Sequence, residues 1–293
     1  MRPLQFGNIN VSRVVEMEYP AFTGDFIFPA ASPEIFAANA GWLEPHFVEP
    51  TTRKLIMSFH TYVVRTGRRT ILVDMCVGND KERPNRPMWH HMQGDYLAKL
   101  AVAGVAPESV DVVMCTHMHA DHVGWNTKLL NGRWVPTFPN AKYVFGRKEY
   151  EFWAEAQRQA AAAEPVNHGS FNDSVLPVIE AGQAVLVEDD HELEHGIWLA
   201  PAHGHTPGNI VIHLDSNDRR AILSGDVLHH PVQLAAPHWS SRFCEDEALS
   251  RRTRSSFIES YADTPTTILT AHFATPTAGK IVRQGDAFRF KLD

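Results

Sequence analysis

The sequence contains little cysteine. Cys76, Cys115 and Cys244 are scattered over a chain of 293 residues, which excludes a disulfide framework. We expect these thiols to be reduced and mostly buried. Long apolar stretches are also absent: no segment approaches the ~20 apolar residues of a membrane-spanning helix, and the first residues hold no signal-peptide core. The sequence therefore predicts a cytoplasmic protein that does not use the membrane.

Positive charge is scarce as well. The chain has 27 basic and 34 acidic side chains, and its formal net charge is −7. A negative protein surface repels nucleic acids and anionic lipids, so we expect neither as a partner. The basic cluster at residues 251–254 is predicted to form one face of a helix. With 44% hydrophobic and 21% charged residues, the composition is that of an ordinary globular protein.

Segments rich in β-branched residues and bounded by turns predict strands in both halves of the chain. These strands cover residues 11–19, 55–67, 68–75, 110–117, 141–146, 184–189, 197–202, 209–215, 220–226 and 266–272. The break at residues 66–68 predicts a hairpin, and helical periodicity is clear over residues 93–105, 147–164 and 245–262. Such alternation favours layered sheets covered by helices.

A possible zinc motif lies at residues 191–195, which spell HELEH. The motif H-E-x-x-H holds zinc when both histidines lie on one helix. Here Gly196 follows at once, a strand is predicted to begin at residue 197, and no third ligand follows at the metzincin spacing. We predict a polar, solvated turn between two strands rather than a metal site.

A stronger candidate follows the strand predicted at residues 110–117. His117 and His119 are two residues apart in an extended segment, so their side chains point to the same side. Asp121 and His122 follow where Gly124 permits a turn, and they can face a neighbouring position. Imidazoles and a carboxylate in this arrangement favour two divalent metal sites.

Further candidate ligands lie at the ends of later strands. His203 and His205 occupy a loop with glycine and proline, Asp226 follows one apolar strand, and His272 ends another. Ligands carried on separate strand ends are typical of a metal site built on a rigid scaffold.

Four elements occur in order: H-x-H-x-D-H at residues 117–122, G-H-T-P-G at 204–208, S-G-D at 224–226, and His272 at a strand end. This set resembles the metallo-β-lactamase superfamily of metal-dependent hydrolases over most of the chain. The resemblance implies an α+β fold, the four-layer αββα sandwich, in which two sheets built by two similar halves face each other and carry helices outside. We expect a single domain of this type over residues 1–293.

The resemblance also implies the ligands of two divalent cations. His117, His119 and His205 would hold the first metal, Asp121, His122 and His272 would hold the second, and Asp226 would bridge both. The G-H-T-P-G frame selects His205 over His203. We expect zinc, although the same ligands accept manganese, iron or cobalt.

The aspartate at position 226 indicates which branch of the superfamily the chain resembles. Class B β-lactamases mostly carry a cysteine near this position, so Asp226 fits the dinuclear, esterase-like branches better. The segment after it and residues 271–290 look most like the branch of acyl-homoserine lactonases and methyl-parathion-hydrolase-like enzymes. Small lactonases of that branch often carry a tyrosine three residues after the bridging aspartate, where this chain has His229. We take Asp121, Asp226 and His229 as the catalytic candidates. For His229, a role behind the ligands or in the structure alone is the alternative to a contact with substrate.

The reaction that these features favour is attack of a metal-bridging hydroxide on a lactone or small ester. A phosphotriester or aryl-ester hydrolase with the same metals is the first alternative, and a non-hydrolytic diiron protein that depends on oxygen is the second. A metal-free binding module is disfavoured, because seven converging polar and charged groups would be costly to bury.

Two aromatic segments are candidates for contacts with a small-molecule substrate. Within the N-terminal segment 1–50, residues 19–36 are rich in aromatics and proline and could cover the metal cleft, pack in the core or form a homodimer contact. Trp89 could line the mouth of a pocket, whereas His90 and His91 are expected at the surface.

Overall fold

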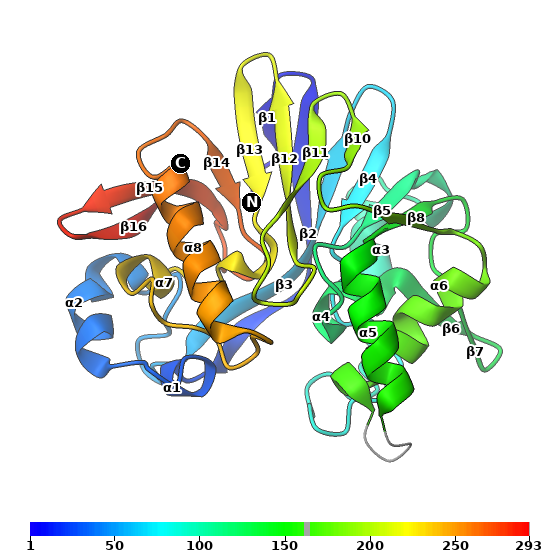
Figure 1. The fold of residues 1–293 in the computed structure, drawn as a ribbon, viewed down its shortest axis with the longest axis horizontal. Coiled ribbons are helices and arrows are strands. Elements are labelled where there is room, and N and C mark those ends of the chain that lie inside the picture. The colour runs from blue at the N-terminus through cyan, green and yellow to red at the C-terminus, as the bar shows by residue number, and fades with distance from the viewer. Residues whose placement is uncertain (161–164, 293) are drawn as a thin grey trace. The chain divides into compact units, whose positions relative to one another are not determined.

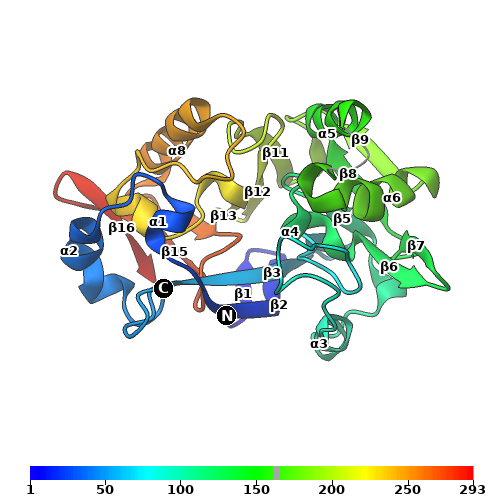
Figure 2. The same ribbon diagram turned by 90° about the horizontal axis from the view of Figure 1, so that it is seen from below.

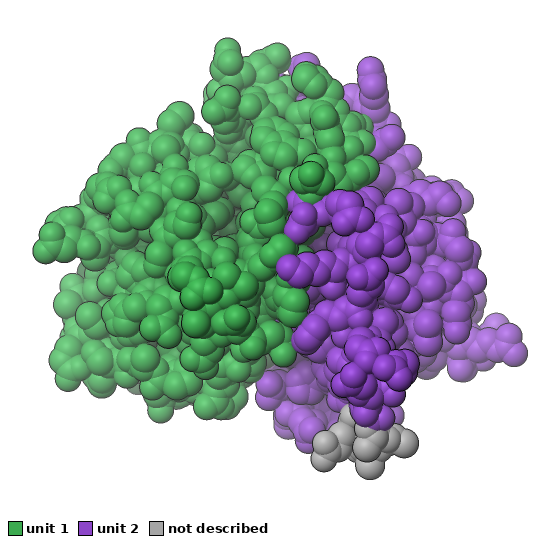
Figure 3. Space-filling view, viewed as in Figure 1, with its two compact units in different colours: residues 1, 17–58, 190–293 green, residues 2–16, 59–189 purple. Residues whose placement is uncertain are grey.

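A computed structural model of the chain describes residues 1–160 and 165–292. The chain forms two compact units (Figure 3). Unit 1 comprises residues 1, 17–58 and 190–293, and unit 2 comprises residues 2–16 and 59–189. The described residues form two seven-stranded sheets and one two-stranded sheet. The single domain expected over residues 1–293 stays a prediction.

Unit 2 contains most of the first seven-stranded sheet, whose strand order is β1-β2-β3-β4-β5-β8-β9. The strands are β1 (Leu4–Phe6), β2 (Ile9–Phe22), β3 (Leu55–Arg65), β4 (Thr70–Val73), β5 (Val112–Met114), β8 (Lys142–Gly146) and β9 (Ala184–Val187). Strands β2 and β3 continue along the chain into unit 1. The small sheet pairs β6 (Thr127–Leu130) with β7 (Arg133–Pro136).

Strands β4, β5, β8 and β9 run parallel to one another. Both faces of a parallel sheet are covered, and β5 is accordingly apolar and buried along its whole length. The helices α3 (Tyr96–Val102), α5 (Arg147–Gln159) and α6 (Leu176–Glu180) all contribute side chains to one core with these strands. Figure 2 shows α5 alongside β8 and β9. A short helix, α4 (Ala120–Val123), follows β5.

Unit 1 contains the second seven-stranded sheet, in which the strands follow one another in chain order from β10 to β16. They are β10 (Glu192–Glu194), β11 (Ile197–Pro201), β12 (Ile210–Ser216), β13 (Arg219–Leu223), β14 (Thr267–Leu269), β15 (Ala278–Gln284) and β16 (Ala287–Leu292). All neighbours are antiparallel except β13 and β14, which are parallel.

The register of this parallel pair places two predicted ligands at one edge of the sheet. Leu223, the last residue of β13, lies opposite Leu269, the last residue of β14. Asp226 and His272 each follow three residues later. Because the carboxyl ends of parallel strands meet at the same edge, the two side chains are brought together.

The helices of unit 1 are α1 (Gly24–Ile27), α2 (Pro33–Leu43), α7 (Val232–Ala235) and α8 (Glu247–Tyr261). Helix α2 begins at the N-cap Ser32 with proline at its first position, a favoured combination. Helix α8 begins at Asp246, whose carboxylate accepts the Leu249 N–H at 2.8 Å. Helix α7 packs against β16, and α2 packs against α7 (Figure 1).

The structure confirms the ten predicted strands and the hairpin between β3 and β4. The three predicted helices are present as α3, α5 and α8, and the end of the second prediction, residues 161–164, lies outside the described residues. Two predictions were wrong. The HELEH segment is not a turn alone, because its centre forms the short strand β10, paired with β11. The basic cluster does not occupy one face of α8, because Arg254 is fully buried whereas Arg251 and Arg252 are exposed.

Among the helices of residues 1–160 and 165–292, none has the length and hydropathy needed to cross a bilayer.

Candidate metal centre

In unit 2, four predicted ligands lie on the segment that follows β5. His117 Nε2 lies 3.1 Å from His119 Nδ1, and the rings of His117 and His122 are 4.0 Å apart. His122 Nε2 lies 4.0 Å from Asp121 Oδ2. His117 and His122 are buried, whereas His119 and Asp121 are partly exposed. The segment thus places imidazole and carboxylate groups close together, as the sequence predicts.

Asp74 holds this segment from the end of the neighbouring strand β4. Its Oδ1 accepts the Thr116 N–H at 2.8 Å, and its Oδ2 lies 3.0 Å from His122 Nδ1. The contact leaves His122 Nε2 as the nitrogen available for a metal, the usual arrangement of a histidine ligand backed by a carboxylate. Asp74 has a φ of 57°, an uncommon conformation for an aspartate. Asp74 was not among the residues predicted from the sequence. The signal was present, because Asp74 follows an apolar strand just as Asp226 does.

Helix α5 supports the segment from another side. Glu149 is almost fully buried, and its Oε1 accepts the Met118 N–H at 2.9 Å and the Trp153 Nε1–H at 2.6 Å. Asn167 receives the Ala120 N–H at 3.2 Å. These bonds fix the backbone between the histidines, so the ligands are placed by rigid surroundings rather than by a free loop.

The turn after the motif requires glycine. A Cβ on Gly124 would lie 1.9 Å from the carbonyl oxygen of Val77, far inside any real contact. The absence of a side chain lets the Gly124 N–H reach the Cys76 carbonyl at 2.8 Å. The chain is thereby anchored to the loop that begins at Asp74.

In unit 1, Asp226 lies at the centre of three imidazoles. Its Oδ2 is 3.2 Å from His205 Nε2 and 3.3 Å from His229 Nε2, and its Oδ1 is 3.2 Å from His272 Nε2. All four side chains are buried. Burial lowers the pKa of His205, but the charge of Asp226 and the bond to it outweigh burial and raise that pKa to about 10.

The imidazoles of His272 and His229 in unit 1 differ in the hydrogen-bond partners of their ring nitrogens. His272 Nδ1 is 3.1 Å from the Ser58 carbonyl oxygen, so its proton faces that acceptor and Nε2 faces Asp226. His229 is 2% exposed, and neither of its ring nitrogens is hydrogen-bonded within residues 1–160 and 165–292. Burial lowers the pKa of His229 to about 4, so its ring is neutral. Its position is held through the backbone, because the His229 N–H is donated to Gln233 Oε1 at 2.7 Å.

Both groups fit divalent metal ions by their donor chemistry. The pairs His117–His119, Asp121–His122 and His205–Asp226 each offer ligand atoms within 4.8 Å of one another. Imidazole nitrogen and carboxylate oxygen are ligands that zinc and related divalent ions accept. A cation bound beside Asp226 would also compensate the buried charge of its carboxylate.

Comparison with known protein families decides the relationship. The family model described as "Metallo-beta-lactamase superfamily" matches residues 60–272. The chain belongs to the metallo-β-lactamase superfamily. The match spans every predicted ligand, from His117 to His272. A search of curated proteins finds no match.

The chain has the α+β metallo-β-lactamase fold, and solved structures share this fold. The hydrolase AbOPH is 21% identical, with a TM-score of 0.80 over 98% of this chain and 95% of that one. The dizinc quorum-quenching lactonase AidC is 19% identical, with a TM-score of 0.76 over 100% and 97%. A probable metal-dependent hydrolase from Staphylococcus aureus is 19% identical, with a TM-score of 0.73 over 99% of each chain.

Within the superfamily frame, the structure separates the neighbouring histidines of the G-H-T-P-G loop. His205 is buried beside Asp226, whereas His203 is partly exposed and its carbonyl accepts the Thr253 hydroxyl at 2.6 Å. The contacts favour His205, as the sequence predicts. In the HELEH segment, His195 is exposed at the end of β10.

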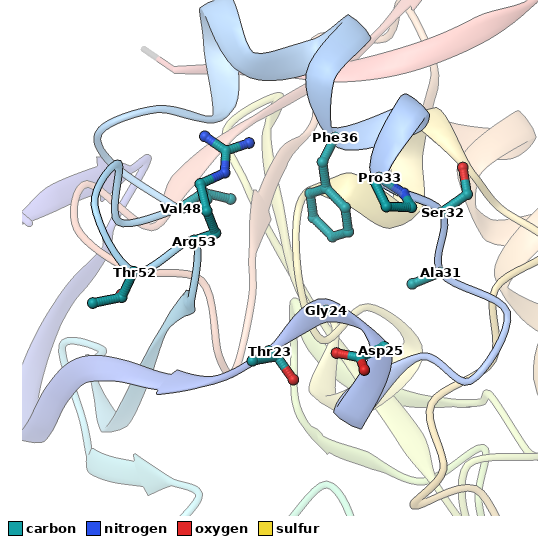
Figure 4. A pocket seen from close by; sticks show the side chains of 10 residues that line it. All are labelled: Thr23, Gly24, Asp25, Ala31, Ser32, Pro33, Phe36, Val48, Thr52 and Arg53. Carbon is teal, nitrogen blue, oxygen red and sulfur yellow. The ribbon is translucent and has the colours of Figure 1, made fainter.

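The aromatic N-terminal segment has two parts with different surroundings. Ile27 and Phe28 are fully buried in unit 1, so part of the segment packs in the core. Other residues line a cavity of about 370 Å³, into which Phe36 points (Figure 4). The lining residues are Thr23, Gly24, Asp25, Ala31, Ser32, Pro33, Phe36, Val48, Thr52 and Arg53. This volume lies within the range of small-molecule sites.

The other aromatic candidates lie in unit 2. Trp89 is buried and packs edge-on against Phe59 at 5.6 Å, so it is part of the interior rather than an exposed pocket rim. His91 is exposed, as expected, whereas His90 is partly buried and its Nδ1 accepts the Arg83 N–H at 3.0 Å.

Proposed function

We propose that the chain is a hydrolase that binds two divalent cations, with zinc as the expected metal, and opens lactones or cleaves related small esters. The observation that carries the proposal is the buried Asp226 carboxylate with an imidazole nitrogen within 3.3 Å on three sides. Superfamily membership supports the metal dependence, and the dizinc lactonase AidC supports the substrate class.

The proposed ligands combine the groups of both units. His117, His119 and His205 would hold the first cation, Asp121, His122 and His272 would hold the second, and Asp226 would bridge the two. Bound in this way, two divalent cations would lower the pKa of a shared water toward neutrality and polarise the carbonyl of the substrate.

The two acidic ligands differ in their access to solvent. The Asp121 side chain is 16% exposed, against 4% for Asp226. The negative charge of the buried Asp226 carboxylate is suited to balance the positive charge of the bound cations. Asp121 is closer to solvent, so we assign to it the transfer of the proton from the attacking hydroxide to the alkoxide that departs when the carbonyl C–O bond breaks, which leaves a carboxylate and an alcohol.

His229 faces the substrate in this proposal. Its ring is buried, its Nε2 lies 3.3 Å from Asp226 Oδ2, and no described residue hydrogen-bonds its Nδ1. A neutral imidazole carries one N–H donor, which can bind a carbonyl oxygen as the tyrosine of small lactonases does. The ring is held in place by the backbone bond to Gln233, so a donor here would be preorganised.

The acyl group of such a substrate would contact an aromatic trio in unit 1. Phe22 stacks on Phe26 with a centroid distance of 5.2 Å, and Phe243 lies 6.3 Å from Phe26. All three rings are partly exposed. Phe243 directly precedes Cys244, whose sulfur contacts His205 at 3.6 Å, so the trio adjoins the proposed metal ligands.

The proposal is tested by proton release from N-acyl homoserine lactones and simple lactones, followed with a pH indicator. Metal-replete protein should release protons much faster than chelator-treated protein. His229→Phe, which keeps the ring and removes both nitrogens, should lower turnover while metal content stays unchanged. The cytoplasmic location stays a prediction.

If metal-replete protein releases no protons from lactones, the lactonase assignment is overturned. Turnover of aryl esters or phosphotriesters would then establish the alternative substrate class. Oxygen consumption by iron-loaded protein, without hydrolysis of any of these substrates, would identify the diiron alternative.

A further inference from the structure

The loop that carries His205 rests directly on the beginning of α8. The Glu245 N–H is donated to the His205 carbonyl at 2.8 Å, and the Asp246 N–H to the Gly204 carbonyl at 3.0 Å. Gly204 has a φ of +127°, and a Cβ there would lie 2.2 Å from the Ser250 nitrogen. Only glycine allows this approach, so the backbone of His205 is fixed against residues 244–250.

The two ring nitrogens of His205 face different groups. Nε2 lies 3.2 Å from Asp226 Oδ2, and Nδ1 lies 3.6 Å from the sulfur of Cys244. A histidine that binds a metal through Nε2 carries its proton on Nδ1 and needs an acceptor there. In His272 that acceptor is the Ser58 carbonyl. The Cys244 sulfur occupies the corresponding place behind His205.

The thiol is itself held in place by a serine and an arginine. Cys244 Sγ donates to Ser250 Oγ at 3.3 Å, and Arg254 Nη1 donates to the same oxygen at 3.3 Å. Arg254 is fully buried and also donates to the Pro237 carbonyl at 2.8 Å. Ser250 Oγ thus accepts from both Arg254 and the thiol. With the thiol hydrogen pointing to Ser250, the sulfur lone pairs remain for His205.

We propose that Cys244 is a positioning residue. Its sulfur accepts a hydrogen bond from the Nδ1–H of His205, and this bond directs Nε2 of the same ring to the metal. The Ser250–Arg254 pair sets the orientation of the thiol. The inference rests on the proposed metal centre and adds to it a group that no ligand motif contains. Cys244 differs in this from Cys76 and Cys115, which are buried in the core of unit 2.

Three substitutions separate positioning from packing. Cys244→Ala removes both the acceptor and the donor, whereas Cys244→Ser keeps both in a smaller side chain. Ser250→Ala leaves the sulfur in place and removes only the group that orients it. Ser256→Ala, at an exposed position of the same helix, is the matched control.

The measurements are the affinity of stripped protein for Zn²⁺, by competition with a chelator, and the side-chain ¹⁵N–¹H resonance of His205 in the zinc-loaded protein. We expect Cys244→Ala to weaken binding by about 10- to 100-fold, the usual effect of losing a partner behind a ligand, and to shift the Nδ1 resonance. Cys244→Ser should restore most of the affinity, Ser250→Ala should give a smaller loss, and Ser256→Ala should match the wild type.

Wild-type affinity and an unchanged Nδ1 resonance in Cys244→Ala would overturn the positioning role while leaving the metal centre intact. If Cys244→Ala does not fold, unchanged affinity and resonance in Ser250→Ala would overturn the proposed orientation of the thiol. A folded wild-type protein that binds no Zn²⁺ would overturn the proposed function, and this inference with it.

Discussion

The two units carry the proposed metal ligands in different ways. Unit 2 carries four of them within residues 117–122, on one turn after β5. Unit 1 carries His205, Asp226 and His272 on three segments that are tens of residues apart. The first group depends on local backbone geometry, whereas the second depends on the register of β13 against β14. The proposed ligands therefore form a local motif in unit 2, whereas those of unit 1 depend on the pairing of strands.

The groups that hold the ligands differ as well. In unit 2 they are the carboxylate of Asp74, which lies behind the His122 imidazole, and that of Glu149, which accepts the Met118 backbone N–H. In unit 1 they are the neutral Ser58 carbonyl and the Cys244 thiol. Charged partners raise the basicity of a ligating imidazole more than neutral ones, so we expect unit 2 to depend more strongly on its outer partners.

Asp226→Asn should have the largest effect, because it removes the charge that three imidazoles face. We expect metal affinity and turnover to fall together, by more than the ~100-fold that loss of an outer partner costs. The check is metal content by mass spectrometry alongside lactone hydrolysis. His195→Ala, on the exposed end of β10, is the control and should bind metal as the wild type does. Normal turnover of Asp226→Asn with both metals retained would exclude a bridging role.

The histidines of the G-H-T-P-G loop provide the next comparison. His205→Ala removes a buried imidazole beside Asp226 and should lower metal affinity by more than ~100-fold. His203→Ala, two residues earlier, should leave affinity and turnover near those of the wild type. An equal loss of metal affinity in the two variants would mean that the affinity depends on the conformation of the loop and not on the His205 side chain.

Asp74→Asn tests whether unit 2 depends on a charged partner. The variant keeps the shape of the side chain but loses its charge beside His122. We expect metal affinity, measured by chelator competition, to fall by about 100-fold, the upper end of the usual loss, and further than in Cys244→Ala. Asp95→Asn, an exposed partner of Lys99 in the same unit, is the matched control and should change nothing measurable. An Asp74→Asn protein with wild-type affinity would remove the contrast between the units.

A smaller effect is expected on stability from Glu16, which accepts the Val77 N–H at 2.8 Å and the Gly78 N–H at 3.1 Å. Burial raises its pKa to about 7 from 4.5. The folded state therefore binds a proton more tightly than the unfolded state, and stability falls as pH rises from 4.5 to about 7. The shift corresponds to about 3 kcal/mol over that window. Urea unfolding at pH 5 and pH 8 should show this decline in the wild type, and a smaller one in Glu16→Gln. An equal decline in both proteins would contradict the assignment.

The strands and the proposed ligands were accessible from sequence because their patterns are local. Apolar runs ending in His117, Asp226 or His272 mark both the strand and the group that follows it. Helix α2 was missed because its residues show weak helical periodicity. The hairpin of β15 and β16 was missed although the residues of β16 alternate between buried and exposed. The outer partners were missed for a further reason. Cys244 and His205 are brought together only by the tertiary approach of Gly204 to α8.

The central claim is that the ligands of both units together hold metal. The most direct test is the number of Zn²⁺ ions retained per chain, measured by mass spectrometry after the protein has been stripped, reloaded and desalted. We predict two ions for the wild type, with reduced occupancy when Asp226 or His122 is replaced. A folded wild-type protein that retains no Zn²⁺, and none of manganese, iron or cobalt, would contradict the account.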